Sequence, residues 1–162
     1  MNFWCVLVQI ISEWDLQAIS KYVREAAEFI NLYSKWRGIN RFPALINVMD
    51  LVADRDEVKK RGFEVPNLYA LRKWIEEESK LGNPALEDKI KKTDDLILKK
   101  ALKWSKAVNE AISKLVRKVP PFPFVRESLI KMNECADVIV VSATPCEVLR
   151  REWEEQDIVR FV

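Results

Sequence analysis

Residues 136–151 read Ala-Asp-Val-Ile-Val-Val-Ser-Ala-Thr-Pro-Cys-Glu-Val-Leu-Arg-Arg, and the predicted fold is built around this stretch. Its first half contains a continuous β-branched run over 138–141, which is typical of a strand buried on both faces of a parallel sheet. Its second half has the signals of a helix start, with Thr144 as the N-cap, Pro145 in the first turn and Glu147 completing a capping box. A strand, a tight turn and a helix N-terminus together place free backbone N–H groups where an anion binds well.

Two other apolar runs are predicted to join this strand in one sheet. Residues 3–11, Phe-Trp-Cys-Val-Leu-Val-Gln-Ile-Ile, favour a buried strand, with the opening of a helix as the alternative, and residues 158–162 favour a last strand. We expect strand 3–11 to lie beside strand 137–142. The exposed edges of such a small parallel sheet invite pairing with another chain, so the sequence predicts a homo-oligomer.

The rest of the chain has the periodicity of helices. Apolar residues recur at helical spacing or follow helix-start signals in the segments 13–37, 42–52, 67–79, 84–92 and 94–117, and two further helices are expected at 124–134 and 145–156. Gly38 is expected to end the first of these helices in the left-handed conformation. The stiff run Val119-Pro120-Pro121-Phe122-Pro123 is the predicted domain boundary.

The apolar run that ends at Ser142 and the upstream segment Pro121-Phe122-Pro123-Phe124-Val125 resemble two motifs of the haloacid dehalogenase (HAD) superfamily. In that family a Ser or Thr at the end of the strand helps to hold the transferring phosphoryl group, and the lead-in reads Pro-Phe-Pro-Gly-Val, so Phe124 replaces a Gly here. The resemblance implies an α/β, HAD-like fold. Residues 13–119 would form a mostly helical cap-like region, and residues 1–12 and 120–162 a partial Rossmann-like core with a small parallel sheet.

The resemblance also implies a function and a site. The family hydrolyses phosphate esters with Mg²⁺, so the expected partner is a phosphorylated small molecule, with Ser142, Ala143 and Thr144 holding the phosphate. In the cap-like region, Arg37 and Arg41 lie with Lys35 in a segment that contains Trp36, and these basic residues are candidates for contacting an anionic substrate. The competing interpretation is an ordinary basic helix end that is favoured by the helix dipole.

The catalytic carboxylates are harder to place, because the family uses an Asp nucleophile with a second Asp two residues later. Glu13-Trp14-Asp15 directly follows the apolar run 3–11, so Glu13 and Asp15 are the candidate catalytic residues, although Glu is one methylene longer than Asp. Acids at a helix start explain the same pattern. Asp54-Arg55-Asp56 has the right spacing, but it follows a helical pattern and favours a solvated helix end.

We therefore expect a truncated or degenerate HAD-like hydrolase with little or no activity. The nucleophilic Asp, the Lys and the acid pair are missing, so Mg²⁺ is implied by the family without residues in this chain to bind it. The alternative function is a non-enzymatic helical module that self-associates or binds a partner. A Mg²⁺-dependent phosphatase assay separates the two hypotheses.

The composition of the chain limits the classes of protein and the kinds of catalytic site that it can have. The 162 residues are 49% hydrophobic with a net charge of +2, which allows a real core and predicts no nucleic-acid binding. The absence of His excludes Ser-His-Asp and Cys-His catalysis. The three Cys share no metal-ligand spacing and indicate reduced thiols in a cytoplasmic protein. The run 3–11 is about half the ~20 residues of a membrane span, so no membrane segment is predicted.

Overall fold

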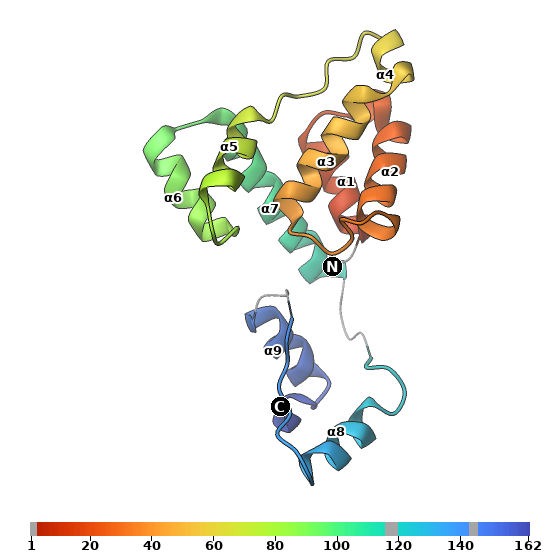
Figure 1. The fold of residues 1–162 in the computed structure, drawn as a ribbon, viewed down its shortest axis with the longest axis vertical. Coiled ribbons are helices and arrows are strands. Elements are labelled where there is room, and N and C mark those ends of the chain that lie inside the picture. The colour runs from red at the N-terminus through yellow and green to blue at the C-terminus, as the bar shows by residue number, and fades with distance from the viewer. Residues whose placement is uncertain (1–2, 116–119, 143–145) are drawn as a thin grey trace. The chain divides into compact units, whose positions relative to one another are not determined.

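The computed structural model describes residues 3–115, 120–142 and 146–162, and within these ranges every regular element is a helix (Figure 1). The α-helices are α1 (Phe3–Glu13), α2 (Ser20–Glu28), α3 (Arg41–Asp54), α4 (Asp56–Lys60), α5 (Tyr69–Glu77), α6 (Asn83–Thr93), α7 (Leu96–Leu115), α8 (Val125–Asn133) and α9 (Cys146–Glu155). Shorter elements are the 3-10 helices η1 (Gln17–Ile19) and η3 (Val159–Phe161) and the π-helix η2 (Phe29–Tyr33). The predicted α/β fold is therefore wrong.

The run 3–11 is not a strand but most of helix α1. Val6, Leu7 and Ile10 are buried along one side of the helix, whereas Val8 is 56% exposed. That pattern follows the period of a helix rather than of a strand. A helix satisfies its backbone groups within the segment itself, so it needs no neighbouring strand. Its apolar side instead packs against α2 in the core.

The other two predicted strands also fail to form a sheet. Residues 137–142 run between α8 and α9 without regular structure, and they pair with no strand among the described residues. Residues 159–161 form the 3-10 helix η3. The prediction was wrong because a β-branched run indicates a strand only where partners exist to pair with it, and neither of the other two runs is a strand.

The predicted helix over 13–37 is broken into shorter pieces. Asp15 adopts a left-handed backbone with φ of 58°, which ends the turn after α1. The chain then continues as η1, α2 and η2, and it leaves the helical conformation at Ser34, whose ψ is 168°. Gly38 does have a positive φ, of 86°, but it lies in the turn beyond this point rather than at the helix end. The other predicted helices occur with boundaries shifted by a few residues.

The chain divides into two compact units, one ending at Ser113 and the other beginning at Lys114. The larger unit contains the main core, in which aromatic side chains are central. The Phe42 ring meets the Trp74 ring edge to face with centroids 5.1 Å apart, and it meets the Trp104 ring with centroids 6.2 Å apart. All three side chains are almost fully buried. This packing joins α3, α5 and α7.

Side-chain caps set the starts of two helices in this unit. Asn40 Oδ1 accepts a hydrogen bond from the Phe42 N–H at the start of α3. Asp95 Oδ1 accepts from the N–H groups of Ile97 and Leu98 at the start of α7. Each cap satisfies amide donors that the helix itself leaves without a partner. These caps fix the starts of α3 and α7, and with them the positions of Arg41 and of the α7 lysines on the surface.

The second unit has a much smaller core. Among its described side chains, only Leu129 and Ile158 are buried. Polar contacts connect its elements. Arg126 donates to the Gln156 carbonyl at 2.8 Å and to Asp157 Oδ2 at 3.1 Å, and Asn133 donates to the Phe161 carbonyl at 3.2 Å. Half of the described large hydrophobic side chains of this unit are exposed to solvent.

Candidate functional site

A pocket of about 470 Å³ lies where the end of α1 meets α7. Its lining residues are Ser12, Glu13, Asp15, Lys99, Lys100 and Lys103. The pocket includes both carboxylates that the sequence singles out as candidate catalytic residues. This pocket is therefore the candidate catalytic site.

Each charge around this pocket is paired with an opposite one. Glu13 Oε2 lies 2.8 Å from Lys103 Nζ, and Asp15 Oδ2 lies 2.8 Å from Lys100 Nζ. The hydrogen bond from Lys100, reinforced by its charge, lowers the pKa of Asp15. The hydrogen bond to Glu13 raises the pKa of Lys103. Asp15 is therefore held ionised, and an ammonium group already lies against each of the two carboxylates.

Trp14 fixes the two carboxylates on either side of it. Its side chain is 1% exposed, and Lys100 Nζ lies 5.5 Å from the centroid of its ring, a cation–π contact. The left-handed backbone at Asp15 turns the next side chain outward, so Asp15 stays exposed while Trp14 is buried. Residues 13–15 thus lie at the end of α1, where Trp14 is buried in the core and the carboxylate on each side of it forms an ion pair.

These residues do not fit a Mg²⁺ site. A hard cation needs several oxygen ligands, and both carboxylates here already serve ammonium groups. Throughout the described part of the chain, no three His, Cys, Asp or Glu side chains gather as a metal-binding group. We therefore derive no metal-dependent step for this pocket.

The predicted phosphate site is only partly within the described residues. Ser142 is exposed at the end of the extended segment 137–142, and Ala143 and Thr144 lie outside the described residues. Helix α9 begins at Cys146, close to the start that the sequence predicts. Residues 137–142 are not a strand, so the parallel-sheet edge on which the anion site was predicted does not form among the described residues.

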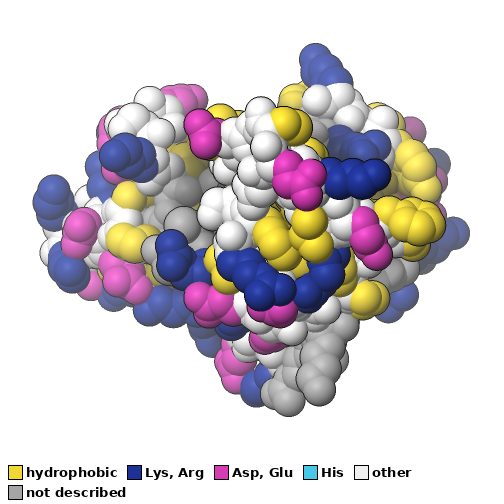
Figure 2. Space-filling model, turned by 90° about the horizontal axis from the view of Figure 1, so that it is seen from below, with side chains coloured by type: hydrophobic (Ala, Val, Ile, Leu, Met, Phe, Trp, Pro, Cys, Tyr) yellow, Lys and Arg dark blue, Asp and Glu magenta, His cyan; other side chains and the backbone are white. Residues whose placement is uncertain are grey.

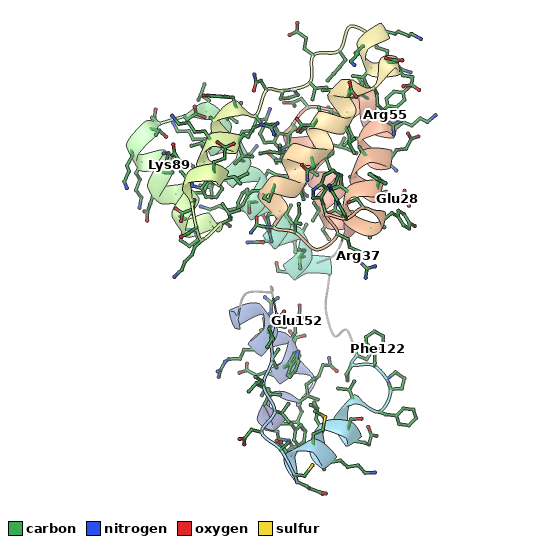
Figure 3. The ribbon with its side chains drawn as sticks, viewed as in Figure 1. Glu28, Arg37, Arg55, Lys89, Phe122 and Glu152 are labelled. Atoms are coloured by element: carbon green, nitrogen blue, oxygen red, sulfur yellow. The ribbon has the colours of Figure 1, made fainter. Side chains whose placement is uncertain are left out.

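Arg37 and Arg41 have different surroundings. Arg37 is exposed, and Figure 3 shows its side chain extending away from the helices. Arg41 Nη1 donates to the Ser105 carbonyl at 3.0 Å, to Ser105 Oγ at 3.2 Å and to Asn109 Oδ1 at 2.7 Å. Burial lowers the pKa of Arg41. Arg41 therefore connects α3 to α7, whereas Arg37 has no polar side-chain contact with another described residue.

No protein-family model matches this chain, and no curated protein or solved structure matches it either.

The lysines of α7 are the pocket residues that sequence reasoning missed. Lys99, Lys100 and Lys103 lie at spacings that place them near one another on a helix. Such a spacing is also typical of an ordinary solvated face, so nothing local marked them as partners of Glu13 and Asp15. The sequence therefore contains no signal that would have identified these lysines as pocket residues.

Two further findings concern the cysteines and the membrane. Cys5 is buried and Cys135 is exposed, and neither takes part in a disulfide. Within the described ranges, no helix has both the length and the apolar character needed to cross a bilayer.

Proposed function

We propose that this chain is a non-enzymatic interaction module that associates with a second copy of itself through the unit beginning at Lys114. The larger unit, with its aromatic core, acts as a stable carrier. The observation that supports this proposal is the distribution of apolar side chains between the two units.

In the second unit, half of the described large hydrophobic side chains are exposed, and only Leu129 and Ile158 are buried. Phe122 is 86% exposed, Phe124 77% and Val141 91%, and Figure 3 shows Phe122 extending away from the helices of its unit. The other exposed large hydrophobic residues of this unit are Ile130, Met132, Ile139, Val140 and Val162. A small unit that buries so little of its apolar surface gains little stability by itself, and such surfaces usually mark interaction sites.

Self-association also agrees with the charge pattern. Lys and Arg side chains alternate with Asp and Glu over the face seen in Figure 2, with apolar side chains between them. The net charge of the chain is only +2, which neither strongly repels a second copy nor supplies the strong positive charge typical of nucleic-acid-binding domains. We propose no nucleic-acid partner, and the free thiols of Cys5 and Cys135 support a cytoplasmic location.

Sedimentation velocity over a range of protein concentrations tests this function. We expect a reversible dimer or larger assembly whose dissociation constant rises by about tenfold in Ile139→Lys, since one well-buried interface side chain has an effect of this order. Leu96→Lys is the matched control, because Leu96 is 78% exposed but belongs to the larger unit. A monomer at high micromolar concentration contradicts the proposal.

A HAD-like phosphohydrolase acting on a phosphorylated small molecule is the second candidate. The observation in its favour is the start of α9 at Cys146, just after Ser142, as in the motif that the sequence resembles. The ion-paired state of Glu13 and Asp15 argues against it. Turnover of p-nitrophenyl phosphate with Mg²⁺, abolished in Glu13→Gln and Asp15→Asn, would favour this candidate over the interaction module.

A further inference from the structure

The segment 137–141 exposes an unpaired backbone together with apolar side chains. None of its N–H or C=O groups forms a hydrogen bond with another described backbone group. Ile139 and Val141 are 81% and 91% exposed, whereas Val140 between them is 44% exposed. In an extended chain alternate residues share a face, so Ile139 and Val141 form one open apolar face.

This segment also has the composition of a strand that pairs. Residues 138–141 are all β-branched, carry no charge, and contain neither Pro nor Gly. Natural proteins usually protect an unpaired edge with Lys, Pro or a bulge, and the run has none of these within it. Short uncharged β-branched segments pair readily with identical segments, because their shapes and hydrogen-bonding groups are complementary.

We propose that residues 139–141 of two copies pair as antiparallel strands with Val140 opposite Val140. The inference rests on the proposed self-association and specifies its geometry. Charge decides the direction of the strands. A parallel pair in register would bring the two Asp137 carboxylates onto neighbouring strands about 5 Å apart, where like charges repel. An antiparallel pair places them at opposite ends.

Symmetry and composition then decide the register. In an antiparallel pair related by a two-fold axis, one residue must lie opposite its own copy. With Val140 at the centre, Ile139 of each copy faces Val141 of the other on the open apolar face. With Ile139 at the centre, Asp137 would face Val141 and place a charge on the open apolar face, whereas with Val140 at the centre Asp137 faces position 143, outside the β-branched run. The centre at Val140 is therefore the better register.

Disulfide trapping in the full-length chain tests this geometry. The background is Cys135→Ser with Cys146→Ser, which leaves only the buried Cys5. Directly opposed residues of antiparallel strands lie about 4.5–5.5 Å apart at Cα, within disulfide range, whereas residues displaced diagonally lie beyond it. We expect Val140→Cys to form a covalent dimer on mild oxidation and Ile139→Cys to form at least about tenfold less under the same conditions.

The alternatives give different results. Equal trapping at both positions would indicate a parallel in-register pair and overturn the proposal. No trapping at either position, in a chain that still sediments as a dimer, would overturn this strand pairing but leave the proposed self-association standing. A chain that sediments as a monomer would overturn both. Circular dichroism of each variant verifies that its helices are retained. Because both positions are exposed, we expect the substitutions to leave the helices intact.

Discussion

Lys100 Nζ lies 2.8 Å from Asp15 Oδ2, although the two residues are 85 positions apart in the chain. This ion pair closes the end of α1 against α7. It also gives the candidate catalytic carboxylate a structural partner, and it makes the stability of the protein depend on pH in a defined direction.

Asp15→Asn should reduce stability at neutral pH and have little effect in acid. The pKa of Asp15 is lowered from its ordinary value of 3.8, chiefly by the hydrogen bond from Lys100. A carboxyl whose pKa is lower in the folded state contributes stability that is present above 3.8 and is lost as the pH falls through the folded value. Urea unfolding of both proteins at neutral pH and well below 3.8 measures the difference.

A comparison of Asn and Ala at position 15 separates the effect of the lost charge from the effect of the backbone conformation. Asp15 has a φ of 58°, a conformation that Asn tolerates and Ala does not. Asp15→Ala should therefore be less stable than Asp15→Asn at both pH values. A stability difference between Asp15→Asn and the parent that does not change with pH would contradict the role of the ion pair.

Trp104→Ala should lower the free energy of unfolding by about 3–5 kcal/mol, because it leaves a large cavity beside Phe42. Trp104→Phe should cost less, since the buried Trp104 Nε1 has no hydrogen-bond partner among the described residues, and a Phe ring fills more of the space than Ala does. Chemical denaturation measures both. Tyr69→Ala is the control, because Tyr69 is 69% exposed and should change stability by no more than about 0.5 kcal/mol. Equal losses in the two Trp104 variants would contradict this account.

Arg41→Met should destabilise the protein by about 1–3 kcal/mol, because it leaves the Ser105 carbonyl without its charged donor. Arg41→Lys should recover only part of the loss, since an ammonium cannot reproduce the planar guanidinium fork. A double-mutant cycle with Asn109→Ala measures the coupling across the 2.7 Å hydrogen bond. Arg37→Met is the matched control and should change stability by no more than about 0.5 kcal/mol.

A chain that ends at Ser113 should fold as the larger unit does in the full-length protein. Its described core side chains, including Phe42, Trp74 and Trp104, all belong to residues up to 113. We expect a cooperative unfolding transition and strong helical circular dichroism for this piece. A peptide covering 120–162 should be far less helical, because only Leu129 and Ile158 are buried among its described side chains. A peptide that folds well as a monomer would contradict the proposal that this unit associates with a second copy.

Local signals in the sequence were sufficient to predict most of the helices. Leu98, Ala101 and Val108 recur at helical spacing and are all buried along α7. Pro84 stands in the first turn of α6, where the missing N–H has no consequence. These features act over one or two helical turns, so the residues themselves determine the structure there.

The strands could not be predicted in the same way, because a strand depends on pairing with another segment. The runs 3–11 and 138–141 are both apolar and rich in β-branched residues, yet the first is a helix packed in the core and the second an unpaired extended segment. The sequence alone determined that these segments are apolar. Only the tertiary structure decided what each of them packs against.

The same division holds for the candidate site. The sequence alone determined that Glu13 and Asp15 follow an apolar run at the end of an element and flank a Trp. Their partners Lys103 and Lys100 come from a helix more than eighty positions later, and no local pattern links the two segments. Only the tertiary structure decided that these carboxylates are ion-paired, because the packing of α1 and α7 brings opposite charges within hydrogen-bonding distance.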